Sequence, residues 1–240
     1  MRFYLKYVSV FFTILFVSSN CTSNKKIHKA YTKNECESYR PKFDYYKIKS
    51  GNIIADVGAG NGWSEGVFSG MSDSVKFYIQ DINTRVLNQD ELNKIVKHYS
   101  SIKLSPQTNS FYMVIGSEKK TNLPNGLFNK IIIHNTFHEF TDPKSLVQDL
   151  TTKVKPNGEI FVSDQFSSDY RKIKHQGCWV LAEKISFVID CFSKAGFHLT
   201  SMTAPNNSLE NYLCFELSEK KGNDFKTMKD SVDVFIKELD

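Results

Sequence analysis

A glycine-rich segment at residues 56–62 (DVGAGNG) constrains the fold of this chain more than any other feature. It follows an apolar run at 53–57 and precedes a segment with helical character that begins at residue 63. Glycine lets the backbone turn sharply and approach a ligand without a Cβ clash, so strand, turn and helix in this order predict a ligand-binding loop. A tight turn that binds nothing is the alternative. The positions of interest are Asp56, Gly58, Gly60 and Gly62.

Apolar strands alternate with helical segments along the rest of the chain. Strands are predicted at 53–57, 75–80, 111–115, 130–134, 159–164, 197–203 and 211–217, and helices at 63–69, 84–99, 143–153 and 179–195. Near-continuous apolar strands separated by helices indicate a parallel sheet covered on both faces. The last two strands follow one another without a helix, which indicates an antiparallel strand. We therefore expect an α/β fold, a Rossmann-like, doubly wound, mostly parallel seven-stranded sheet with an antiparallel edge strand.

Asp81 ends the second predicted strand, about 20 residues beyond the glycines. A carboxylate at this place can accept hydrogen bonds from both hydroxyls of an adenosine ribose. Ile82 beside it would then lie against the adenine, and Asn83 is expected to cap the following helix. The glycine spacing disfavours a nicotinamide dinucleotide, because the G-x-G-x-x-G pattern would need a glycine in place of Trp63.

The D-x-G-x-G-x-G segment and Asp81 together resemble the class I S-adenosylmethionine-dependent methyltransferases. Similar stretches follow at 116–118 (GSE), 128–132 (FNKII) and 155–159 (KPNGE). The resemblance implies S-adenosylmethionine as cofactor, with the glycine loop beside its methionine part, Glu118 near its adenine and Asn135 also at the cofactor. It implies methyl transfer to a small-molecule acceptor, which the sequence does not identify.

A polar segment at 135–140 (NTFHEF) follows the fourth predicted strand, where ligands bind in open α/β sheets. The methyl group of this cofactor is already activated, so the protein mainly aligns the reactants and removes a proton. His138 is the candidate general base, with Glu139 orienting it; the alternative is that His138 only shapes the loop. A later stretch is expected to form part of an acceptor lid, through Tyr170, Arg171 and His175.

The first twenty residues differ from the rest of the chain. Arg2 and Lys6 precede an uncharged apolar run at 7–17, and Cys21 follows shortly after it. Such a short run suits a signal-peptide core rather than a bilayer-spanning helix, which needs about 20 residues. The segment resembles a bacterial lipoprotein signal, which implies that Cys21 becomes the lipidated first residue of a domain facing the periplasm or exterior. The alternative is an uncleaved inner-membrane anchor with a cytosolic domain.

Four regions are therefore expected. They are a signal peptide at 1–20, a flexible tether at 21–38, the methyltransferase domain at 39–218 and a charged tail at 219–240. Because S-adenosylmethionine is made in the cytosol, the competing function is a membrane-tethered lipoprotein that retains the fold as a non-catalytic binding module.

Charge and cysteine spacing bear on possible partners. The formal charge of +5 falls by two to +3 without Arg2 and Lys6, which is too mild to indicate a nucleic-acid partner. The cysteines show no CxxC spacing, so no metal site is expected. Cys178 and Cys191 are expected at the two ends of one helix, too far apart for a disulfide. The sequence sets no oligomeric state.

Overall fold

The computed structural model describes residues 24–103, 105–168, 172–203 and 210–217. Its centre is a seven-stranded sheet with the order β3-β2-β1-β4-β5-β7-β6. Neighbouring strands from β3 to β5 are parallel, whereas β7 is antiparallel to both β5 and β6. The predicted Rossmann-like fold is confirmed, and the last two strands form its antiparallel hairpin. The strands are β1 (Ile53–Val57), β2 (Lys76–Asp81), β3 (Ser110–Ile115), β4 (Phe128–His134), β5 (Val154–Asp164), β6 (Phe197–Thr203) and β7 (Asn211–Leu217).

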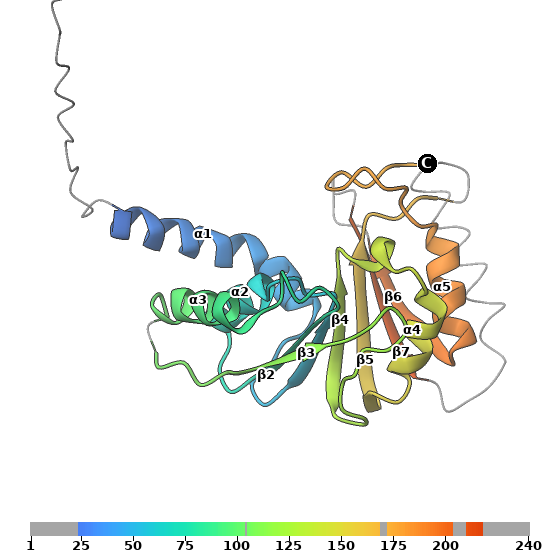
Figure 1. Ribbon diagram of the computed structural model, residues 1–240, viewed down its shortest axis with the longest axis horizontal. Coiled ribbons are helices and arrows are strands. Elements are labelled where there is room, and N and C mark those ends of the chain that lie inside the picture. The colour runs from blue at the N-terminus through green and yellow to red at the C-terminus, as the bar shows by residue number, and fades with distance from the viewer. Residues whose placement is uncertain (1–23, 104, 169–171, 204–209, 218–240) are drawn as a thin grey trace, which may run out of the picture.

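Helices cover both faces of this sheet, with α1, α2 and α3 on one face and α4 and α5 on the other (Figure 1). A short 3-10 turn, η1, lies in the connection after β4. The bounds are α1 (Asn24–Tyr45), α2 (Trp63–Met71), α3 (Gln89–Ser100), η1 (Phe137–Glu139), α4 (Pro143–Leu150) and α5 (Ile185–Lys194).

Alternate residues of the central strands enter two separate cores. In β4, Ile131 and Ile133 belong to the core that includes α4 and α5, whereas Ile132 belongs to the core that includes α1, α2 and α3. All three side chains are buried, and burying such a side chain contributes about 1.5–3 kcal/mol. This alternation explains the continuous apolar run, because both faces of the strand are covered.

The strand order reverses between β1 and β4. The chain leaves β1 toward α2 on one face and leaves β4 toward α4 on the other (Figure 1). The two diverging connections create the crevice in which open α/β sheets bind ligands. The glycine loop and the segment at 135–140 therefore lie at the same place in the fold.

Two predicted details of the helix after β2 were wrong. This helix, α3, begins at Gln89 rather than at 84, and Asn88 caps it by accepting a hydrogen bond from the Glu91 N–H at 3.0 Å. Asn83 instead accepts the N–H of Arg85 at 3.1 Å in the turn after β2. Both asparagines suit a cap by type, so only the backbone path distinguishes them.

The predicted helix at 179–195 is shorter than expected. Trp179 has a φ of 62°, which a right-handed helix cannot accommodate, and α5 begins only at Ile185. The preceding segment is irregular, with a single antiparallel bridge between Lys174 and Leu181. Cys178 therefore lies outside the helix that contains Cys191, and both thiols are free.

Two segments predicted as loops are regular structure. The segment expected to be a flexible tether, 21–38, is helical from Asn24 onward, and the helix continues to Tyr45. Its last turns are anchored because Phe43 packs against Phe68 of α2, with ring centroids 6.1 Å apart. The turn expected at 155–158 lies within β5, where Asn157 takes a φ of 62° at an irregularity in the pairing with β4.

Several sequence features lie outside the described residues. These are the signal peptide at 1–20, Cys21, the lid residues Tyr170 and Arg171, and the tail at 219–240. Within the ranges that the structure describes, no helix is both long enough and apolar enough to cross a membrane.

Candidate functional site

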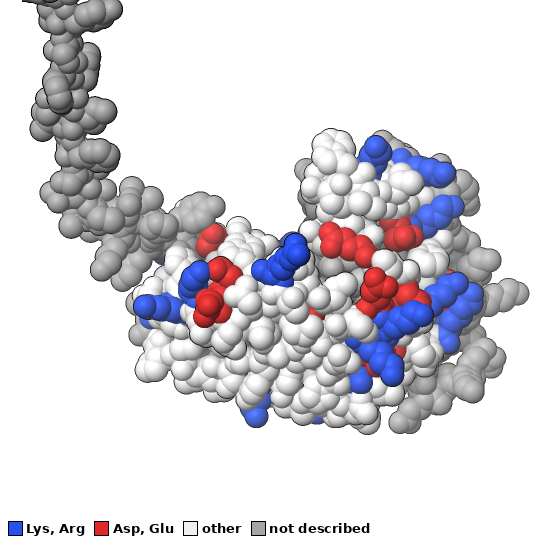
Figure 2. Space-filling view, viewed as in Figure 1, with Lys and Arg blue, Asp and Glu red and all other residues white. Residues whose placement is uncertain are grey.

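A cavity opens where the carboxyl ends of β1, β2 and β4 meet. The empty space within it is about 530 Å³, part of which is open to solvent. Figure 2 shows a hollow in this face of the molecule with acidic atoms beside it. The cavity is lined by Val57, Gly58, Gln80, Asp81, Ile82, Ser117, Glu118, Thr136, Glu139, Phe140, Thr141 and Leu146.

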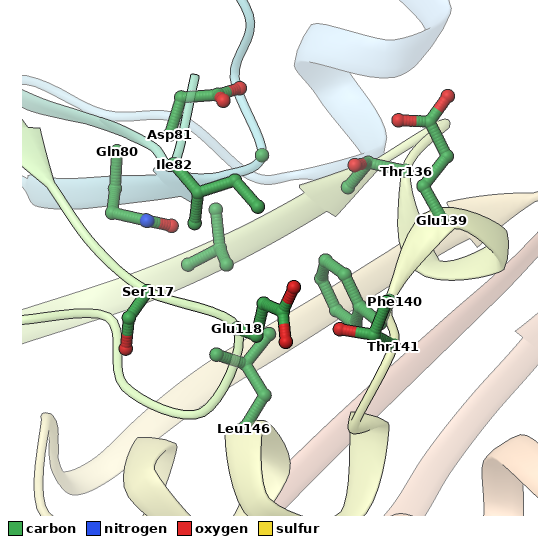
Figure 3. A pocket seen from close by; sticks show the side chains of 12 residues that line it. Gln80, Asp81, Ile82, Ser117, Glu118, Thr136, Glu139, Phe140, Thr141 and Leu146 are labelled. Carbon is green, nitrogen blue, oxygen red and sulfur yellow. The ribbon is translucent and has the colours of Figure 1, made fainter. Parts of the chain in front are cut away.

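The cavity brings together residues that lie far apart in the sequence. Figure 3 shows Asp81 and Ile82 on one side and Glu139 and Phe140 on the other. The predicted site residues that line it are Gly58, Asp81, Ile82, Glu118 and Glu139. The other predicted residues do not line it, namely Asp56, Gly60, Gly62, Asn135 and His138.

Asp81 is held in place by the glycine loop. Its Oδ2 accepts the backbone N–H of Gly60 at 2.8 Å, and its Oδ1 accepts the N–H of Asn83 at 2.7 Å. Each carboxylate oxygen can accept a second hydrogen bond. The side chain is therefore fixed in orientation and keeps acceptor capacity toward the cavity.

The loop glycines adopt backbone angles that other residues avoid. The φ values are 76° at Gly58, 59° at Gly60 and 81° at Gly62. A Cβ at Gly58 would lie 2.4 Å from Oγ1 of Thr136, so this glycine lets the loops after β1 and β4 touch. At Gly60 a Cβ would meet only Val86, at 3.9 Å, so the space beside this residue is open to a ligand.

Two buried carboxyl groups lie beneath the loop. Asp56 at the end of β1 and Glu65 in α2 are 3% and 1% exposed. The two carboxyl groups interact with each other through a hydrogen bond and through charge. Burial, followed by the charge of Glu65, raises the pKa of Asp56 well above its usual value. Burial also raises the pKa of Glu65. Raised pKa values favour the protonated, uncharged carboxyl, so the two buried acids can share a proton beneath the loop.

A second group of polar residues, which the sequence did not connect, lies beside the cavity. Nδ1 of His138 is 2.9 Å from Oδ2 of Asp164, the last residue of β5. Nε2 of His138 is 3.3 Å from Sγ of Cys178, and Nδ1 of His175 is 3.5 Å from the same sulfur. Nε2 of His175 lies 2.8 Å from Oδ1 of Asn135. The His138 side chain therefore contacts Asp164 and Cys178 and does not line the cavity.

The surroundings shift the pKa values of the two histidines in opposite directions. Burial lowers the pKa of His138, but the hydrogen bond and charge of Asp164 outweigh it, so the net pKa is raised. Burial and the neighbouring His138 lower the pKa of His175. The rings stack with centroids 3.8 Å apart, so protonation of one disfavours protonation of the other.

Sequence reasoning missed these contacts for identifiable reasons. Asp164 and His138 are 26 positions apart and meet only because β4 and β5 are neighbours. Cys178 was expected at the start of a helix, which hid its place beside His138. Leu146 lines the cavity as an apolar residue of α4, and apolar helix periodicity alone gives no functional signal.

No protein-family model matches the chain, and no protein of curated function matches it in sequence. Solved structures do share its fold. An S-adenosylmethionine-dependent methyltransferase from Aquifex aeolicus superposes with a TM-score of 0.57 at 18% identity, over 79% of this chain and 98% of that one. A TehB-like S-adenosylmethionine-dependent methyltransferase from Corynebacterium glutamicum has a TM-score of 0.53 at 11% identity, over 79% and 99%.

The same fold also supports other chemistry. The cyclase SpnF, which catalyses a cycloaddition of the 4+2 type, has a TM-score of 0.50 at 13% identity, over 73% of this chain and 60% of that one. The similarities therefore establish the class I methyltransferase fold, while the reaction has to be argued from the site.

Proposed function

We propose that this chain binds S-adenosylmethionine in the cavity and transfers its methyl group to a small-molecule acceptor. The observation that carries the proposal is Asp81, which lines the cavity at the fold's switch point while the N–H of Gly60 fixes its carboxylate. A carboxylate at this position suits the two hydroxyls of a ribose. The glycine spacing argues against a nicotinamide dinucleotide.

The surrounding residues fit the other parts of such a cofactor. The apolar side chain of Ile82, 53% exposed on the cavity side of the turn, offers a surface for an adenine ring. Glu118 lies in the loop after β3, where its carboxylate can accept a hydrogen bond from an amino group.

The chemistry demands little from the protein beyond alignment. S-adenosylmethionine supplies a methyl group activated by its sulfonium sulfur. The chain's own residues would bind the acceptor, exclude water and remove a proton. Glu139 lines the cavity with a largely exposed side chain, so its carboxylate can receive that proton. His138, the base expected from the sequence, is turned toward Asp164 and Cys178 and is the weaker candidate.

Calorimetric titration of the full-length protein tests the cofactor assignment. We expect binding of S-adenosylmethionine and of its demethylated product, and no binding of NAD. Heat with NAD alone, or no heat and no thermal shift at saturating S-adenosylmethionine, would contradict the proposal. Binding of the cofactor without methyl transfer to any of a broad panel of thiols, phenols, amines and carboxylic acids would support the non-catalytic binding module instead.

We further propose that the domain is tethered to a membrane through its N-terminus. The basis is the basic start, the apolar run at 7–17 and the cysteine at position 21. Lipidation at Cys21 would place the domain in the periplasm or outside the cell. An uncleaved anchor would leave it in the cytosol, where the cofactor is made.

A further inference from the structure

The cluster of His138, His175 and Cys178 is not explained by methyl transfer. The two imidazoles are almost fully buried, with side chains 1% and 4% exposed. One nitrogen from each ring and the thiol sulfur lie within 4.8 Å of one another. Imidazole nitrogen and thiolate sulfur are the ligands that zinc-type ions prefer.

We propose that His138, His175 and Cys178 form a binding site for a divalent transition-metal ion of the zinc type. The distances from the sulfur to the two ring nitrogens are 3.3 Å and 3.5 Å. In a tetrahedral site with Zn–N near 2.0 Å and Zn–S near 2.3 Å, nitrogen and sulfur ligands lie about 3.5 Å apart. Two edges of the expected tetrahedron are therefore already present.

The hydrogen-bond partners of the two imidazole rings determine which ring nitrogens are available to bind a metal ion. The carboxylate of Asp164 can only accept, so Nδ1 of His138 donates to it and Nε2 keeps its lone pair. In the same way, Nε2 of His175 donates to Oδ1 of Asn135 and leaves the lone pair on Nδ1. Metal-binding histidines characteristically donate their second ring N–H to a carboxylate or carbonyl oxygen. Both available nitrogens face the Cys178 sulfur.

Metal binding requires one local adjustment. The imidazole rings are stacked at an interplanar angle of 17°, so an ion in the plane of the His138 ring does not lie in the plane of the His175 ring. The His175 ring has to turn and release the Gly177 N–H, which lies 3.2 Å from its Nδ1. His175 lies on the irregular segment before α5, outside any helix or named strand.

A fourth position lies toward the cavity. Oε1 of Glu139 is 3.7 Å from Nε2 of His138, and Glu139 also lines the cavity. Its carboxylate or a water molecule can complete a four-coordinate ion. The sequence did not predict this site because its ligands come from η1 and from a segment 37 to 40 positions further on, without any CxxC pair.

The test is zinc binding by the full-length protein, purified in detergent and freed of metal with a chelator. Competition with a chromophoric chelator should give one Zn²⁺ per chain. Cys178→Ser and His175→Ala should each lower the affinity more than 100-fold, and Asp164→Asn about 10–100-fold, the scale for outer-shell partners of metal ligands. Cys36→Ser, a control on α1 distant in sequence, should leave the affinity unchanged.

Cobalt substitution provides a second measurement, which reports on the metal–sulfur bond itself and not on the stability of the variants. Co²⁺ should produce a thiolate-to-metal charge-transfer band that is absent in Cys178→Ser and present in Cys36→Ser. Because Cys178 is exposed, its serine variant should keep the unfolding temperature of the parent. Absence of stoichiometric Zn²⁺, or a Co²⁺ band that survives Cys178→Ser, would overturn the proposal. Neither measurement uses S-adenosylmethionine, so the result is independent of the proposed function.

Discussion

The backbone N–H of Gly60 donates a hydrogen bond to Oδ2 of Asp81 at 2.8 Å, across 21 positions of sequence. The bond joins the loop after β1 to the end of β2. The same loop is also held by the N–H groups of Gly58 and Ala59, which both donate to the Gln80 carbonyl at 2.9 Å. The loop and the carboxylate are therefore positioned together before any ligand binds, which lowers the ordering cost of binding.

Replacing Gly60 by alanine should weaken binding of S-adenosylmethionine at least tenfold, about 1.4 kcal/mol. The added methyl group would enter the open space beside the loop, where the proposed binding mode places the methionine part of the cofactor. Gly51→Ala is the matched control, because Gly51 has a φ of 82° and precedes β1 at the opposite end of the strand. A Cβ added at Gly51 would meet nothing within 4 Å.

Both glycine variants should lose about 1–2 kcal/mol of unfolding free energy, since alanine is strained at positive φ. Calorimetry and chemical denaturation separate the two effects. Equal cofactor affinity in the two variants would mean that the ligand does not approach Gly60.

Asp81→Ala should weaken cofactor binding by about 1.5–3 kcal/mol, the scale of hydrogen bonds to a charged group. Asp90→Ala, at an exposed position in the first turn of α3, is the control and should bind as the parent does. Titration calorimetry measures both. Unchanged affinity in Asp81→Ala would mean that the ribose is held elsewhere.

The order of strands and helices could be predicted because apolar runs and glycine turns are local signals. Asp81 could be placed for the same reason, since it ends a strand that the pattern identifies. The burial of Asp56 next to Glu65 could not be predicted from the sequence. Acidic residues are rarely buried, and no local pattern marks the acid within α2 as an exception. The irregular segment around Trp179 was missed because its apolar residues mimic helix periodicity while the backbone takes a positive φ.

Replacing Cys21 by serine should leave the precursor unlipidated and uncleaved at that position. Two acyl chains hold a protein stably on a membrane, but the uncleaved apolar run can also retain it, so membrane fractionation alone does not decide. Mass spectrometry of the mature N-terminus of the parent protein distinguishes a lipidated Cys21 from an uncleaved anchor. A chain that begins at Met1 without lipid would establish the anchor, and protease protection in intact cells would then place the domain on the cytosolic side.

Glu65→Gln should change the pH dependence of stability. The folded-state pKa values of Asp56 and Glu65 are both raised, whereas the unfolded chain titrates near the ordinary values of about 4. The unfolded state therefore loses these protons first, so the free energy of unfolding falls as pH rises from about 4 through the folded-state pKa values. A tenfold difference in proton affinity between the two states corresponds to about 1.4 kcal/mol.

The glutamine variant removes one of the two acids and also the Glu65 charge that adds to the raised pKa of Asp56. Its free energy of unfolding should therefore fall less between pH 4 and neutrality than that of the parent. Glu37→Gln, at an exposed position on α1, is the control and should follow the parent curve. Urea denaturation at a series of pH values measures all three proteins. Parallel curves for Glu65→Gln and the parent would show that Glu65 does not carry a raised pKa in the folded protein.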